Sequence, residues 1–63
     1  MAGFDTSDIV EVAIRIEENG IRFYRHAAGI AKSPEVKALF SRLSEDEAEH
    51  RRTFAGILAD LDP

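Results

Sequence analysis

A short acidic segment, Glu45-Asp46-Glu47-Ala48-Glu49-His50, contains residue types that bind metal ions. Within it, Glu47 and His50 are three residues apart, and on a helix residues with this spacing share a face. A carboxylate and an imidazole side by side are ligands suited to iron, manganese or zinc. The E-x-x-H pattern also arises by chance on acidic helices, so its interpretation as a metal site depends on the rest of the chain.

Composition limits the kind of site and partner. The chain has 63 residues, a net charge of −4 and no cysteine. So short a domain buries only about 60% of its unfolded surface, and it needs a metal or a partner for stability. Without cysteine, disulfides, thiolate zinc sites and iron–sulfur clusters are excluded. The acidic balance argues against nucleic acid, and no apolar run approaches the roughly 20 residues of a membrane span. We expect a soluble, cytoplasmic protein.

Two long helices joined by a short loop account for the chain. We predict helices over about residues 5–31 and 34–61, with the loop at residues 32–33. No strand pattern appears anywhere in the sequence. Helices with so short a connection pack as an antiparallel hairpin, so residues 1–63 are predicted to form one all-α domain.

The predicted helix starts have clear capping signals. Asp5 is the expected N-cap of the first helix, with Thr6 and Ser7 as close alternatives. In the second, Ser33 precedes a proline that suits the first helical position, Pro34.

Metal-ligand residues recur within the apolar stripes of both helices. Steps of three and four residues are typical of a packed helical seam. In the second helix Glu47 and His50 occupy consecutive positions of such a stripe, and in the first helix Glu17 occupies one. The stripes are Val36, Phe40, Leu43, Glu47, His50, Phe54, Ile57 and Leu61, and Val10, Ala13, Glu17, Gly20, Tyr24, Ala27 and Ala31.

The three polar stripe residues are predicted to meet. Both helices rise by about 1.5 Å per residue, so distance from the loop sets the level of each side chain. Glu17 lies about 15 residues before the loop, and Glu47 and His50 lie about 15 and 17 residues after it. All three therefore reach one level, roughly 24 Å from the turn.

The apolar surface predicted for the first helix is too wide for a single neighbouring helix to cover. Beside the stripe run Ile9, Ile16, Phe23 and Ile30, spaced by seven residues. We therefore expect a second copy to complete a four-helix bundle, as a homodimer or a higher even-numbered homo-oligomer. Pairing would bring together four carboxylates and two imidazoles, the ligand set of a carboxylate-bridged dimetal centre. Two divalent ions would offset the repulsion among the four carboxylates.

The segments AIRIEENGIRFY (residues 13–24) and LSEDEAEH (residues 43–50) resemble the ferritin-like di-iron carboxylate proteins, rubrerythrins in particular. The resemblance covers most of the chain, yet only half of the family's usual domain, which has two such helix pairs. The nearest analogues are the encapsulated ferritins, whose short chains build the di-iron site between two subunits. The resemblance thus implies two irons per dimer, with manganese or zinc compatible with the same ligands.

The resemblance also implies roles for individual residues. Glu17 corresponds to a terminal carboxylate ligand, Glu47 to the bridging carboxylate and His50 to the terminal imidazole. Tyr24 is similar to the aromatic residue whose hydroxyl touches the carboxylates. Asp46 matches a position that accepts a hydrogen bond from an imidazole of the other subunit.

Several neighbours of these residues have other expected roles. Gly20, one turn from Glu17, is expected to leave room beside the metals. Glu18 is expected to point outward, and His26 and Arg51 are expected to be ordinary surface residues.

By resemblance, the expected function is ferroxidase-type oxidation of Fe(II) by dioxygen or peroxide, for iron storage or detoxification. Storage implies an encapsulating shell protein and a location inside a protein compartment. One alternative is a rubrerythrin-like peroxide reductase with an external electron donor, because the chain has no rubredoxin-type cysteines. Another is a non-enzymatic helical oligomerisation module that binds zinc or no metal.

Overall fold

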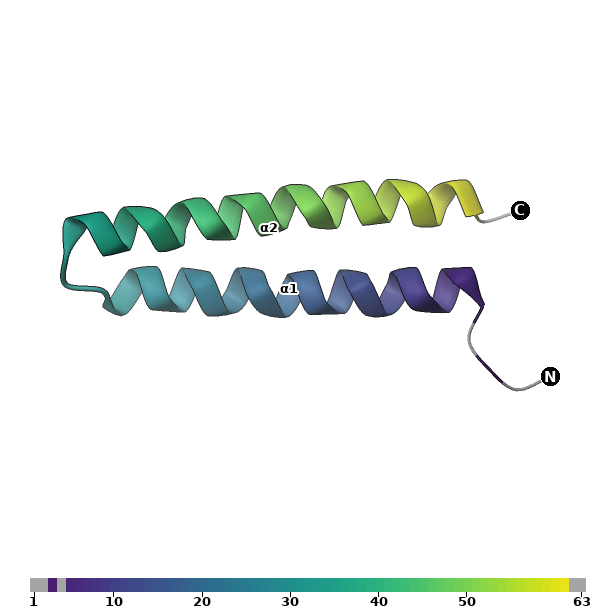
Figure 1. The fold of residues 1–63 in the computed structure, drawn as a ribbon, viewed down its shortest axis with the longest axis horizontal. Helices are drawn as coiled ribbons and strands as arrows, with labels where there is room; N and C mark the ends of the chain where they lie inside the picture. The colour runs from purple at the N-terminus through teal and green to yellow at the C-terminus, as the bar shows by residue number, and fades with distance from the viewer. Residues whose placement is uncertain (1–2, 4, 62–63) are drawn as a thin grey trace.

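The computed structural model describes residues 3 and 5–61, and it is a hairpin of two antiparallel helices (Figure 1). Helix α1 spans Thr6–Ile30 and helix α2 spans Pro34–Leu61. The helices lie side by side, with the turn at one end and the start of α1 and the end of α2 at the other. The described residues contain no strand, which confirms the predicted all-α hairpin. Neither α1 nor α2 has a stretch long and apolar enough to cross a membrane.

Helix α1 begins with a reciprocal capping box. The Asp5 carboxylate accepts a hydrogen bond from the backbone N–H of Asp8 (3.0 Å). In return the Asp8 carboxylate accepts one from the backbone N–H of Asp5 (3.2 Å). Both bonds satisfy backbone donors that have no partner within the helix. Asp5 is therefore the N-cap of α1, as predicted.

Side chains around the turn tie the two helices together. The hydroxyl of Ser33 accepts a hydrogen bond from the N–H of Val36 (3.3 Å), and Pro34 fills the first position of α2. Across the turn, the Lys37 Nζ donates to the carbonyl of Ala28 (2.8 Å) in the last turn of α1. That carbonyl has no acceptor role within the helix, so the bond satisfies it and helps to set the relative level of the two helices.

The hairpin is a single layer with a small interior. Its Cα atoms extend over 50 × 21 × 10 Å, and the shortest extent is about the diameter of one helix. Among the described residues Val10, Ile21 and Ser44 are buried, and no side chain is fully enclosed. So small a core makes an isolated hairpin marginally stable.

Large apolar side chains remain exposed on both helices of the hairpin. On α1 the row with seven-residue spacing is 60–66% exposed, and on α2 four large apolar residues are 41–51% exposed. Gly20 and His50 lie near the middle of their helices. Ile16 and Phe23 lie four residues before and three residues after Gly20, and Ile57 lies seven residues after His50. Both exposed rows therefore pass the middle of the hairpin. We call these residues the open face: Ile9, Ile16, Phe23, Ile30, Val36, Leu39, Ile57 and Leu61.

The predicted stripe of α2 is only partly buried against α1. Val36, Ile57 and Leu61 are 41–42% exposed, whereas Ser44, which is not part of that stripe, is 7% exposed. In a four-helix bundle each stripe faces two neighbouring helices, and the hairpin supplies only one. Helix α2 therefore turns one edge of its stripe, beside Ser44, towards α1 and leaves the other edge on the open face.

Candidate metal centre

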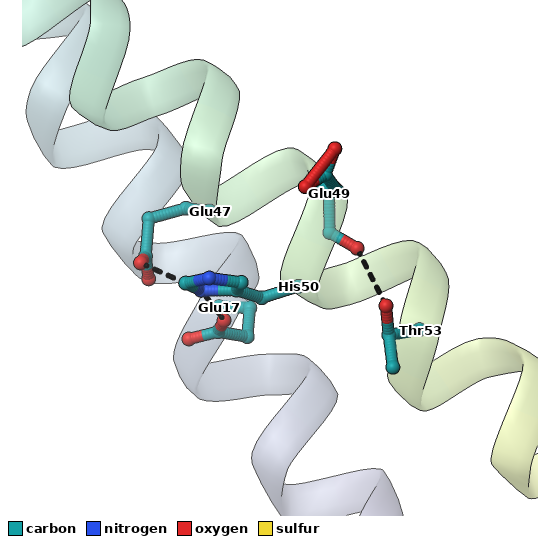
Figure 2. Close-up of polar contacts among 5 residues, drawn as sticks. All are labelled: Glu17, Glu47, Glu49, His50 and Thr53. Atoms are coloured by element: carbon teal, nitrogen blue, oxygen red, sulfur yellow. Dashed lines mark hydrogen bonds and ion pairs between the residues drawn. The ribbon is translucent and has the colours of Figure 1, made fainter.

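Three polar side chains meet between the helices near the middle of the hairpin (Figure 2). Glu17 extends from α1, while Glu47 and His50 extend from successive turns of α2. Helical spacing places Glu47 and His50 on one face, and the shared turn brings Glu17 to their level. The structure thus brings together all three candidate ligands, while their role as metal ligands stays a prediction.

The imidazole of His50 contacts both carboxylates. Its Nδ1 lies 3.1 Å from Oε2 of Glu17 and 3.2 Å from Oε1 of Glu47. The Glu17 and Glu47 side chains are 13% and 22% exposed, whereas the His50 side chain is 56% exposed. The carboxylates are therefore held between the helices, and the imidazole lies over them on the solvent side.

These spacings are compatible with a bound metal ion. One ligand atom from each residue lies within 4.8 Å of the other two, and the described residues contain no other such group. Oxygen and nitrogen ligands bind first-row metals at about 2.0–2.2 Å, which places neighbouring ligand atoms roughly 3.0–3.6 Å apart. Both distances from His50 Nδ1 fall in that range. Three side chains leave coordination positions open for further ligands.

The two carboxyl groups interact unfavourably when both are ionised. Burial between the helices raises the pKa of Glu17 above its ordinary value, and a shared hydrogen bond and charge repulsion from Glu47 raise this pKa further. The His50 imidazole acts in the opposite direction and lowers the pKa of Glu17. A cation bound between the carboxylates would remove the repulsion that raises this pKa.

The raised pKa of Glu17 predicts how the stability of the metal-free protein changes with pH. The folded state holds the Glu17 proton more tightly than the unfolded state, so the free energy of unfolding falls as pH rises through and above the ordinary value of 4.5. Glu17→Gln removes this titration, so the variant should lose less stability than the wild type on going to neutral pH. Urea unfolding with a chelator, followed by circular dichroism, measures the two pH profiles. Parallel profiles would contradict the prediction.

A second polar contact joins the helices at the same level. Arg51 Nε and Nη2 lie 2.8 and 2.7 Å from Oε2 of Glu18. Glu18 was expected to point outward and Arg51 to be an ordinary surface residue, but their side chains, 36% and 42% exposed, pair with each other between the helices. The separation of 33 residues, shared with Glu17 and His50, is the sequence signal for this pair. At this exposure the ion pair stabilises the hairpin by at most about 1 kcal/mol.

Tyr24 and Asp46 lie outside the immediate contacts of the three candidate ligands. The Tyr24 ring stacks on Phe40, with centroids 6.0 Å apart, and meets Phe23 edge-on at 5.4 Å. Asp46 is exposed on α2. No hydrogen bond of the described residues joins either side chain to the candidate ligands, and their roles beside a metal centre stay predictions. His26 is exposed, as expected.

A protein-family model described as Rubrerythrin matches residues 8–63, which include nearly all of α1, the whole of α2 and all three candidate ligands. The chain belongs to the rubrerythrin family. This membership confirms the predicted relationship to the ferritin-like di-iron superfamily. Rubrerythrin-family proteins typically bind iron, and many are oxidoreductases. Comparisons with curated proteins and with solved structures found no match.

Proposed function

We propose that this rubrerythrin-family chain binds Fe(II) at a dimetal centre formed between two subunits and oxidises it to Fe(III). The observation that carries the proposal is the convergence of Glu17, Glu47 and His50, with ligand atoms within 4.8 Å of one another. Membership of an iron-binding family supports iron over manganese or zinc.

The coordination number supports a second subunit. Each hairpin offers two carboxylates and one imidazole, which is too few for two iron ions. A paired arrangement doubles this set to four carboxylates and two imidazoles, the number found in carboxylate-bridged dimetal bundles. A two-fold axis through the middle of the hairpin would bring the two groups together, because each group lies near the middle of its helices.

The exposed surface supports the same pairing. Clustered exposed apolar side chains on a small protein mark an interaction site, and here they occur on both helices, before and after the candidate ligands along each helix. A second hairpin placed on the open face would bury those apolar rows and shield the 56% exposed imidazole of His50 from solvent. The proposed assembly is therefore a homodimer, or a larger oligomer of even number built from such dimers.

The candidate ligands have different roles in the proposed reaction. Glu17 and Glu47 offset the positive charge of the substrate, and His50 supplies a nitrogen donor. Each Fe(II) loses one electron, and dioxygen or peroxide accepts the electrons. The chain is too small to enclose an iron mineral, so storage of the Fe(III) product would require a separate protein shell.

Native mass spectrometry, with and without Fe(II) added under anaerobic conditions, tests the proposed centre. We expect even-numbered oligomers that carry two irons per pair of chains. A stable, metal-free monomer in excess Fe(II) would contradict both the site and the assembly.

Exposure of the loaded protein to oxidant then tests the proposed reaction. Net accumulation of Fe(III) with dioxygen or peroxide supports iron oxidation as the function. Steady turnover of peroxide with an added reductant, without iron accumulation, would instead identify a peroxide reductase.

A further inference from the structure

Gly20 lies in the interior of α1, where glycine is unfavourable. Glycine destabilises a helix interior relative to alanine, because it loses more backbone freedom on folding. Among the described residues a positive φ occurs only at Gly3, so the backbone of Gly20 has a conformation that alanine adopts equally well. The reason for glycine at this position must therefore lie in its surroundings.

The carboxyl group of Glu47 occupies the space that a side chain at Gly20 would fill. A Cβ atom built on Gly20 would lie 2.9 Å from Glu47 Oε2, and 3.5 and 3.6 Å from its Cγ and Cδ atoms. The other carboxyl oxygen, Oε1, lies 3.2 Å from Nδ1 of His50. One end of the Glu47 carboxyl thus rests against the backbone of α1, and the other faces the imidazole.

The other helical glycines have no such contact. A Cβ atom at Gly29 or at Gly56 would have no neighbouring atom within 4 Å. Gly56 lies in the interior of α2, so alanine there changes helix propensity without a new contact. Gly56→Ala is therefore a matched control for Gly20→Ala.

We propose that Gly20 is a positioning residue for Glu47, and that its missing side chain lets the Glu47 carboxyl lie within reach of Glu17 and His50. The inference rests on the proposed function, because it assigns Glu47 a ligand orientation. A methyl group at position 20 displaces the carboxyl group, at the flexible end of its side chain, away from α1. Such a change leaves the helix intact and disturbs the candidate ligand set.

Metal binding by Gly20→Ala and Gly56→Ala tests the proposal. Calorimetric titration of the full chain with Co(II), together with the Co(II) absorption spectrum, reports the affinity and the ligand geometry. Gly20→Ala should keep its helicity, bind Co(II) about tenfold more weakly and show an altered spectrum, on the scale seen when groups that orient metal ligands are changed. Gly56→Ala should match the wild type in both measurements. Wild-type affinity and spectrum in Gly20→Ala would overturn the proposal.

A double-mutant cycle on the metal-free protein tests the contact between Gly20 and Glu47 independently of metal binding. With Glu47→Ala as background, Gly20→Ala meets no carboxyl group and should raise the urea midpoint, as alanine does in helix interiors. In the wild-type background that gain should be smaller or reversed. Equal effects in both backgrounds would overturn the proposal. Failure of the wild type to bind Fe(II) or Co(II) would instead refute the proposed function, and the cycle would still report on the Gly20–Glu47 contact.

Discussion

The double variant Glu17→Ala, His50→Ala is expected to bind no iron at the proposed centre and to lose Fe(II) oxidation. Within a pair of hairpins it removes two carboxylates and both imidazoles, so only the two Glu47 carboxylates remain. Wild-type protein at a free metal concentration of 100 times the dissociation constant should gain about 2.7 kcal/mol in unfolding free energy, and the variant should gain none. Iron per chain after anaerobic loading, and melting curves with and without Fe(II), measure these effects.

The matched control for this variant is Glu49→Ala, His26→Ala. It removes the same two residue types from exposed positions, so net charge and composition change equally. The control should retain wild-type iron content and the melting shift on metal addition. A Glu17→Ala, His50→Ala variant that pairs normally with unchanged metal content would refute the dimetal centre and favour a simple oligomerisation module.

Ile57→Glu is expected to prevent the pairing of hairpins and to unfold much of the chain. Ile57 lies on the open face, seven residues after His50, so a second hairpin would bury it. A charge placed in that interface would be desolvated without a partner, at a cost of several kcal/mol. Because the isolated hairpin has so small a core, loss of the interface should also reduce helicity. Sedimentation velocity and far-ultraviolet circular dichroism measure both effects.

Ala59→Glu separates pairing from properties of the hairpin itself. Ala59 is exposed on α2, two residues after Ile57, and at about 100° per residue it points away from the side of the helix that carries Ile57. A charge at Ala59 therefore stays in solvent whether or not a second hairpin binds. Only Ile57→Glu should change the oligomeric state. Equal behaviour of the two variants would contradict pairing through the open face.

Stability and function oppose each other at the centre of this hairpin. The positions of Glu17 and Glu47 within helical stripes would ordinarily hold apolar residues, and the carboxylates repel when ionised. Gly20 adds a further cost in α1. A bound cation would offset the repulsion, and a second hairpin would supply the missing core. Metal binding and assembly should therefore stabilise each other by mass action.

The periodicity and the caps of the chain determine the hairpin and the level at which the polar residues meet. These features can be read from the sequence because they are local: Asp5 and Ser33 cap their own helices, and the rise per residue is the same in both. The convergence of Glu17 with Glu47 and His50 follows from counting residues away from a short turn.

Tertiary packing alone decided how each helix is rotated about its axis. It buried Ser44 and left Ile57 on the open face. It also seated the Glu47 carboxyl against the backbone at Gly20, the contact from which we infer a positioning role. The heptad stripe of a helix in a four-helix bundle contacts two neighbouring helices. The spacing of its residues does not determine which edge of the stripe packs against the single neighbouring helix of the hairpin. That choice depends on side-chain packing between residues some 30 positions apart, where small rotations exchange one contact for another.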